Sequence, residues 1–334
     1  MGFWNFFKNI NNIKNNKTKQ KVKLGLALSG GGARGCAHIG VVRAFEENGI
    51  DFDFVAGTSA GSLVGAFYSA GLDSYKMEEA VKQIKASEIK NSKLFFMPSK
   101  TEGIEAIITK NLGDILFSDL KKPFCAVSVD LKTGHEARLT SGNLAKAVAG
   151  SCAVPGFFNP VEYDNMILVD GGLTNTIPSD IPKLFGCDYV VSVDVNRTRG
   201  YGTESSKLLD VMSASLRIMT KANAQKGIQE ADVLIQPNLE KFKSTKLDGF
   251  KEMIAEGYNA GIKAIPQIKK LLGITEPIVK TPIRKPVNLL REQRKIKKTE
   301  KQTQKTQEKI VKPKKQIKAK KTDITESTKQ TKTE

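Results

Sequence analysis

Histidine, cysteine and long apolar runs are all scarce in this 334-residue sequence. It has two histidines and four cysteines, and no two cysteines form a C-x-x-C pair. These counts argue against a structural zinc site, and they favour reduced thiols in a cytoplasmic protein. The uncharged run at residues 55–72 consists mostly of Gly, Ser, Thr and Ala, so we expect no membrane span.

Acidic residues are outnumbered only at the two ends of the chain. The formal net charge is +18, yet residues 24–280 are formally neutral. Residues 1–23 contain six lysines and no acid, and residues 281–334 contain 18 Lys and Arg against 6 Asp and Glu. A neutral body lacks the basic stripe of a nucleic-acid-binding core, so we predict no specific nucleic-acid partner. Two hypotheses for the basic ends stay open: attraction to an anionic membrane surface, or solvated extensions without a partner.

Three segments are predicted along the chain. Residues 1–21 are a basic, aromatic leader, residues 22–272 are the folded domain, and residues 273–334 are a Lys-rich tail. The tail cannot bury enough apolar surface to offset its ordering entropy, so we expect it to be disordered. The leader fits either a short helix at a membrane interface or a frayed segment.

Apolar strands alternate with helical patterns in the folded domain. This alternation predicts an α/β fold with a mostly parallel sheet covered on both faces. Strands are expected at 22–28, 52–56, 124–130, 166–169, 189–195 and 233–236, and helices at 36–48, 60–70, 74–120 with a break at Pro98, 143–150, 205–228 and 248–272.

A glycine-rich loop, Gly30–Gly35, follows the first strand and precedes a helix. Its N–H groups can converge on an anion at the helix N-terminus. The same spacing matches the dinucleotide-binding fingerprint, which requires an acid at the end of the second strand. Asp53 has about the right separation but begins that strand. The loop also fits a tight turn without any ligand.

The segment Gly57–Gly61 is a G-x-S-x-G motif between a strand and a helix. This is the pattern of a nucleophile elbow, in which the serine sits in a strained turn and projects its hydroxyl. Ser59 would be the nucleophile, flanked by Thr58 and Ala60. The alternative is a purely structural one, a turn of small residues that lets the helix and the strand pack closely.

A serine nucleophile needs a base, and the choice here is narrow. The α/β-hydrolase order of serine, acid and histidine would require an acid before His135, since no histidine follows it. His38 fits a packing or loop-ordering role, and His135 fits a polar surface turn. Asp170, followed by Gly171 and Gly172, is the best-placed carboxylate because α/β sheets build their sites at carboxyl strand ends.

The three motifs occur in the order of the bacterial patatin-like phospholipase family, and the chain resembles its members over about residues 22–272. Further similar stretches are Cys36–Gly40, Ala153–Pro160 and Ala231–Pro237. The resemblance implies a three-layer α/β/α fold and a catalytic dyad of Ser59 and Asp170. It also implies an oxyanion hole in the glycine-rich loop, formed by Gly30, Gly31, Gly32, Ala33, Arg34 and Gly35. Arg34 would direct charge toward the oxyanion or a lipid phosphate, or else brace the loop.

The activity implied by this resemblance is that of a serine lipid acyl hydrolase. The substrate would be a phospholipid or lysophospholipid, cleaved through an acyl-enzyme without a metal or cofactor. Three alternatives stay open: an acyltransferase using the same dyad, a dinucleotide-binding α/β protein using Gly30–Gly35, and an inactive scaffold that presents the basic ends. Anionic lipid would be a further partner of those ends, on the inner face of a membrane.

Overall fold

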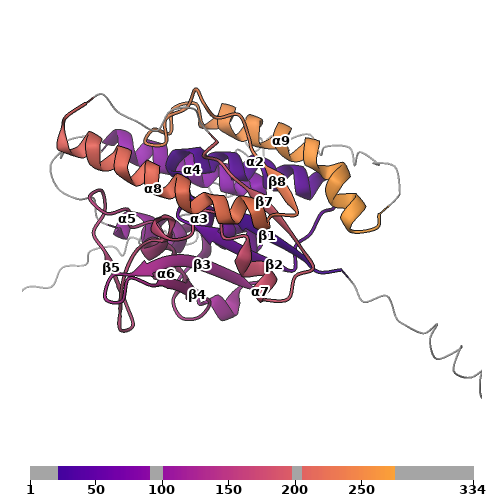
Figure 1. Cartoon of the computed structure of the whole chain (residues 1–334), viewed down its shortest axis with the longest axis horizontal. Coiled ribbons are helices and arrows are strands. Elements are labelled where there is room, and N and C mark those ends of the chain that lie inside the picture. Colours follow the sequence, from indigo (N-terminus) through magenta and orange to yellow (C-terminus); the bar gives the residue numbers. More distant parts are fainter. Residues whose placement is uncertain (1–21, 91–100, 198–204, 275–334) are drawn as a thin grey trace, which may run out of the picture. The chain divides into compact units, whose positions relative to one another are not determined.

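The computed structural model describes residues 22–90, 101–197 and 205–274, which are built around one mixed sheet (Figure 1). The predicted leader, the expected break at Pro98 and residues 275–334 of the tail lie outside the described residues. The sheet has eight strands in the order β5-β6-β3-β2-β1-β7-β8, with β4 paired to β3. The strands are β1 (Leu24–Leu28), β2 (Phe54–Thr58), β3 (Phe124–Asp130), β4 (Glu136–Leu139), β5 (Val161–Tyr163), β6 (Met166–Asp170), β7 (Tyr189–Val193) and β8 (Val233–Ile235).

The centre of the sheet is parallel and one side of it is antiparallel. Strands β3, β2, β1, β7 and β8 run parallel to one another, which confirms the predicted core. Strands β4 and β6 instead pair antiparallel with β3, and β5 pairs antiparallel with β6. Asp170 therefore does not end a strand that is parallel to the others, and the reason given above for its position is wrong.

Helices cover both faces of the sheet. The helices are α2 (Cys36–Glu47), α3 (Ala60–Ala70), α4 (Ser74–Lys90), α5 (Glu102–Leu112), α6 (Leu144–Ser151), α7 (Asp180–Leu184), α8 (Leu208–Glu230) and α9 (Phe250–Leu271), with short 3-10 turns η1 (Gly32–Gly35), η2 (Phe117–Asp119) and η3 (Gly171–Leu173). Helix α2 lies beside α9 (Figure 1). Alternate residues of β2 show the two layers, because Val55 joins the main core with α2 and α3, whereas Phe54 and Ala56 pack with Ile181 of α7.

The predicted strands and helices are found within a few residues of their expected bounds, except that α5 ends at Leu112 rather than at 120, and β4, β5 and α7 are additional. Each of the three is short, spanning three to five residues. Segments of that length carry too few periods for a hydrophobic pattern to identify them. Strand β2 runs to Thr58, two residues further than expected, and so leads directly into Ser59.

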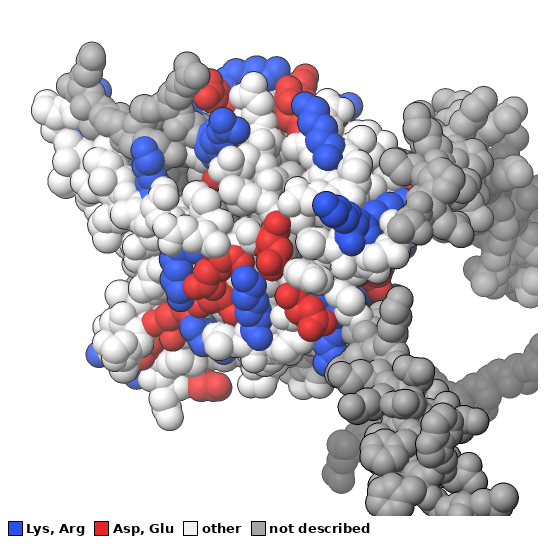
Figure 2. All heavy atoms as spheres, turned by 45° about the vertical axis from the view of Figure 1, so that its right-hand side comes forward, with Lys and Arg blue, Asp and Glu red and all other residues white. Residues whose placement is uncertain are grey.

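Charges of both signs are interspersed on the face of the body seen in Figure 2. One cluster is built on Asp180, which pairs with Lys226 at 3.0 Å and Arg138 at 3.5 Å. This mixture agrees with the formal neutrality of residues 24–280. Within the described ranges, no helix combines the length and apolar content needed to cross a bilayer.

Candidate active site

Ser59 occupies a strained turn between β2 and α3. Its backbone has φ 51° and ψ −123°, a conformation that non-glycine residues rarely adopt. A side chain at Gly57 would collide with the carbonyl of Gly61, and one at Gly61 would collide with that of Leu28. The N–H of Ser59 donates a hydrogen bond of 2.9 Å to Ser151 Oγ, which anchors the turn to α6. The segment thus has the local geometry of a nucleophile elbow at a helix N-terminus.

The register of strands β2, β3 and β6 places Asp170 close to Ser59. Strand β3 lies between β2 and β6, pairing Val127 with Thr58 on one side and Ser128 with Asp170 on the other. The end of β6 therefore lies level with the end of β2. This register places the Ser59 side chain beside the Asp170 carboxyl group, where it favours the ionised form.

The carboxyl group of Asp170 is buried, with 8 % of the residue exposed. Burial raises its pKa to about 6, although hydrogen bonds from Ser59 and from the N–H of Gly172 at 2.8 Å act in the opposite direction. A carboxylate with a pKa in this range is a far better proton acceptor than an exposed one.

The glycine-rich loop presents two of its N–H groups without an acceptor. The N–H groups of Gly30, Ala33 and Arg34 donate to the carbonyls of Thr176, Ser244 and Gly31, respectively, at 3.1, 2.8 and 3.3 Å. Among the described residues, those of Gly31 and Gly32 have no such partner. The loop also lines the same cavity as Ser59. These two groups are therefore the donors available to an oxyanion.

Arg34 braces a neighbouring loop. Its Nε and Nη2 both donate to the carbonyl of Phe242, at 2.9 and 2.7 Å. The same loop supplies the Ser244 carbonyl that accepts from Ala33. Of the alternatives considered for Arg34, the bracing contact is the one that the structure contains.

The two histidines stand apart from the serine. His38 is fully buried and its Nε2 bonds to the carbonyl of Ser29 at 2.9 Å, so it orders the start of the glycine-rich loop as expected. Burial lowers its pKa to about 4. His135 lies exposed in the turn between β3 and β4, also as expected.

Groups that hold metals are sparse near this site. All four cysteines are free and buried, and burial raises the pKa of Cys152, beside the elbow, to about 12. In the described part of the chain, no cluster of three or more His, Cys, Asp or Glu side chains has a metal-binding arrangement.

Ser59 and Asp170 line a cavity of about 740 Å³ at the carboxyl ends of the parallel strands. One wall is apolar and comes from α3, α4, α5 and the loop after α6. A second part of the lining comes from α8 and the loops after β7 and β8, and it is more polar although it includes Leu216, Ile228 and Leu247. The apolar side chains of the first wall are Leu63, Ile84, Ile104, Ile107, Val154, Phe157 and Phe158. A cavity of this size and character fits an acyl chain.

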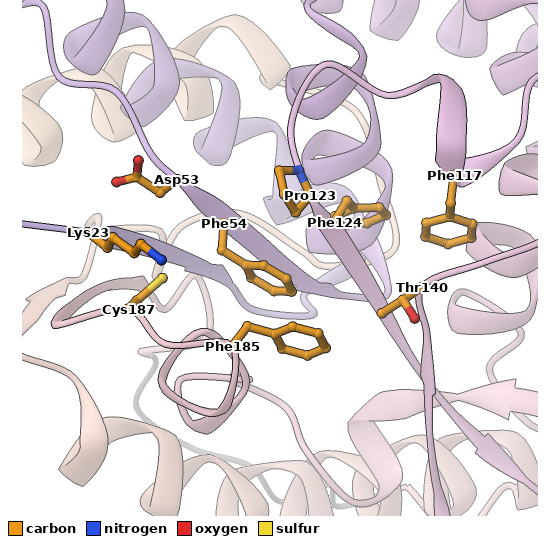
Figure 3. Close-up of a pocket in the computed structure, with 9 residues that line it drawn as sticks. All are labelled: Lys23, Asp53, Phe54, Phe117, Pro123, Phe124, Thr140, Phe185 and Cys187. Atoms are coloured by element: carbon orange, nitrogen blue, oxygen red, sulfur yellow. The ribbon is translucent and has the colours of Figure 1, made fainter. Parts of the chain in front are cut away.

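A second cavity, of about 440 Å³, lies at the opposite ends of the strands (Figure 3). The rings of Phe54 and Phe185 are stacked there with centroids 4.4 Å apart, and Lys23 and Asp53 lie at one end. Asp53 accepts the N–H of Leu24 at 2.9 Å. It is therefore at the far end of β2 from Gly30–Gly35, which removes the acid that a dinucleotide site would need.

Sequence reasoning missed three contributors to the site: Ser151, the carbonyl of Ser244 and the inner face of α8. Ser151 acts through one backbone hydrogen bond, and Ser244 contributes its main chain, so neither leaves a residue-type signal. The α8 face does leave one, since its cavity-lining residues recur at intervals of three and four.

Comparisons with known proteins agree with this geometry. Residues 26–182 match the family model described as patatin-like phospholipase. An NTE family protein of Mycobacterium tuberculosis is 32 % identical over 186 residues, covering 54 % of this chain and 32 % of that protein. Lysophospholipase NTE1 of Mycosarcoma maydis is 27 % identical over 277 residues, covering 73 % of this chain and 15 % of that protein. The chain thus spans about a third or less of the length of these relatives.

The fold has a counterpart among solved structures. VipD from Legionella pneumophila matches with a TM-score of 0.51 and 15 % identity, over 76 % of this chain and 67 % of that one. The site and fold define an α/β protein with a nucleophile elbow beside a buried carboxylate. The match at residues 26–182 contains all three motifs, and it places this segment of the chain in the patatin-like phospholipase family.

Proposed function

We propose that this chain is a serine lipid acyl hydrolase that cleaves carboxylic ester bonds of phospholipids or lysophospholipids. The observation that carries the proposal is the placement of Ser59, in its strained turn, beside the buried carboxylate of Asp170 in one cavity that has an apolar wall. Membership of the patatin-like family, and similarity to a lysophospholipase, support the same chemistry.

In the proposed reaction, Ser59 Oγ attacks the ester carbonyl carbon as its proton passes to Asp170. The N–H groups of Gly31 and Gly32 stabilise the negative oxygen of the tetrahedral intermediate. Collapse of the intermediate breaks the ester C–O bond, and Asp170 returns the proton to the departing alcohol. Water then attacks the acyl-enzyme, gives a proton to Asp170, and releases the fatty acid as Ser59 regains its hydrogen.

The environment of each group suits its proposed role. A pKa of about 6 keeps most of Asp170 ionised at neutral pH, while leaving it basic enough to accept the serine proton. The N-terminus of α3 favours negative charge near Ser59. The anchored turn fixes Ser59 Oγ before substrate binds, which reduces the reorganisation required in the transition state.

Two substitutions test the dyad: Ser59→Ala and Asp170→Asn, assayed on a short-chain nitrophenyl ester and on phospholipid vesicles. We expect both variants to lose nearly all turnover. Ser69→Ala is the matched control, because Ser69 is a buried serine of α3 whose hydroxyl has no hydrogen-bond partner among the described residues. Wild-type rates in both dyad variants would refute the assignment.

We also propose that the basic ends, residues 1–23 and 281–334, attract the enzyme to anionic lipid at the inner, cytoplasmic face of a membrane. Near such a surface each basic residue contributes about 1 kcal/mol, screened by salt. Their concentration of positive charge next to a neutral body supports this role.

A further inference from the structure

The cavity beside Ser59 has an inner polar wall whose chemistry the acyl hydrolase proposal leaves unused. Besides the apolar wall, α8 and the loops after β7 and β8 contribute hydroxyl, amide and cationic groups and the carboxylate of Asp194. These side chains are Asp194, Asn196, Arg197, Ser213, Arg217, Thr220, Lys221, Gln225, Gln236, Ser244 and Thr245. The cavity is therefore amphipathic, like a lipid with one acyl chain and a polar head.

One face of α8 forms most of this wall. Its cavity-lining residues recur every three or four positions along the helix, and they are Ser213, Leu216, Arg217, Thr220, Lys221, Ala224, Gln225 and Ile228. Such spacing places them on one side of a helix. Of the two cationic residues on this face, Arg217 is half-buried and Lys221 is exposed.

Helix α8 is fixed against the loop that follows Asp170. Thr176 Oγ1 donates to the carbonyl of Thr220 at 2.9 Å, and Asn223 Nδ2 donates to that of Leu173 at 2.6 Å. A Cβ added to Gly172 would lie 3.4 Å from Thr220 Cγ2. Arg217 is one helical turn before Thr220, about 4.5 Å along the axis, so it lies close to the catalytic loop.

The arginines that line the cavity differ in the contacts that their guanidinium groups make. The guanidinium of Arg34 donates twice to the Phe242 carbonyl. In contrast, within the described ranges no ion pair involves Arg197 or Arg217. A guanidinium group matches the geometry of a phosphate, with which it forms two parallel charge-assisted hydrogen bonds.

We propose that Arg217 and Arg197 bind the phosphate of a glycerophospholipid whose acyl chain lies on the apolar wall. The site would then select phosphate-bearing lipid esters over uncharged ones, and Arg34 would act as a brace rather than as the phosphate ligand. This inference rests on the proposed acyl hydrolase function, and it assigns the head-group side of the cavity to α8 and the loop after β7.

The test compares two esters with the same acyl chain, a lysophosphatidylcholine and a monoacylglycerol, in the full-length protein. We expect Arg217→Gln to lower kcat/KM for the lysophospholipid about 10- to 100-fold more than for the monoacylglycerol, because only the former loses charge-assisted hydrogen bonds. Arg197→Gln should act in the same direction, and Arg217→Lys should restore part of the loss. Lys226→Gln is the control, since Lys226 is on the same helix but outside the cavity.

The possible outcomes separate this inference from the proposed function. Equal losses on both esters, or no loss on either, would overturn the phosphate site while leaving the hydrolase intact. A wild-type protein that cleaves neither ester would refute the hydrolase proposal and the inference with it. Labelling of each variant with a fluorophosphonate shows whether Ser59 stays reactive, which distinguishes a lost phosphate contact from a misfolded site.

Discussion

The central sheet carries a cavity at each end of its parallel strands, and the two cavities differ in how their polar groups are used. At the carboxyl ends, Ser59 is strained, Asp170 is buried with a raised pKa, and two N–H groups lack an acceptor. At the amino ends, stacked phenylalanines form the lining, and Asp53 accepts a backbone N–H. Costly arrangements that persist in a fold mark its functional sites, so the carboxyl-end cavity is the reactive one.

The sharpest test of this comparison replaces one carboxylate by an amide in each of the two cavities. We expect Asp170→Asn to lower ester turnover by about 10²- to 10⁴-fold, because the general base is lost. Asp53→Asn should retain turnover, since the Asp53 carboxylate accepts the Leu24 N–H at the far end of the sheet from Ser59. Steady-state kinetics on a nitrophenyl ester measures both, and equal effects would remove the distinction between the two cavities.

A smaller loss is expected from the proposed oxyanion hole. Gly32 has φ 56° and faces the carbonyl of Ser244, so Gly32→Ala should displace its N–H and cost about 10²- to 10³-fold in kcat. Gly134→Ala is the matched control, because Gly134 has φ 72° in a turn with open space around it. If the two variants were equally active, backbone strain alone would explain why position 32 is a glycine. The proposed role of the Gly32 N–H in the oxyanion hole would then be wrong.

Stability should respond to pH in opposite ways at two buried carboxylates. The folded-state pKa of Asp170 is above its unfolded value, so its contribution to the free energy of unfolding falls as pH rises from about 4 to about 6. Asp170→Asn should therefore gain stability relative to wild type across that interval, by up to about 3 kcal/mol.

Asp180 provides the contrast. Burial alone would raise its pKa, but hydrogen bonds from Asn175 and Lys226 lower it overall. Its contribution is present above its unfolded pKa and is lost as pH falls through the lower folded value. Urea unfolding of wild type, Asp170→Asn and Asp180→Asn between pH 3 and pH 8 tests both signs. If the free energy of unfolding of the two variants changed with pH in the same way, the inferred difference between the environments of Asp170 and Asp180 would be contradicted.

The smallest effect concerns the chain ends rather than either cavity. Deletion of residues 281–334, which carry 18 Lys and Arg against 6 Asp and Glu, should weaken binding to anionic vesicles at low salt more than it affects turnover of a soluble ester. Vesicle sedimentation at two salt concentrations measures the change. Unaltered binding would remove the membrane role of the tail.

Sequence reasoning was most effective where residue type and chain order carry the signal. The elbow, the glycine-rich loop and the parallel core follow from local patterns, and all three have the expected local structure. The position of Asp170 followed from a wrong premise, because antiparallel pairing of β6 with β3 depends on long-range register that no local pattern encodes. The bracing of Arg34 on Phe242, 208 residues away, is likewise invisible before the chain folds.

The central claim is that Ser59 is a nucleophile activated by Asp170, and a fluorophosphonate probe tests it most directly. Mass spectrometry of the labelled wild-type protein should locate the adduct on Ser59, with labelling abolished in Ser59→Ala and strongly slowed in Asp170→Asn. Wild-type labelling that is absent, or that falls on another residue and persists in Ser59→Ala, would contradict the claim.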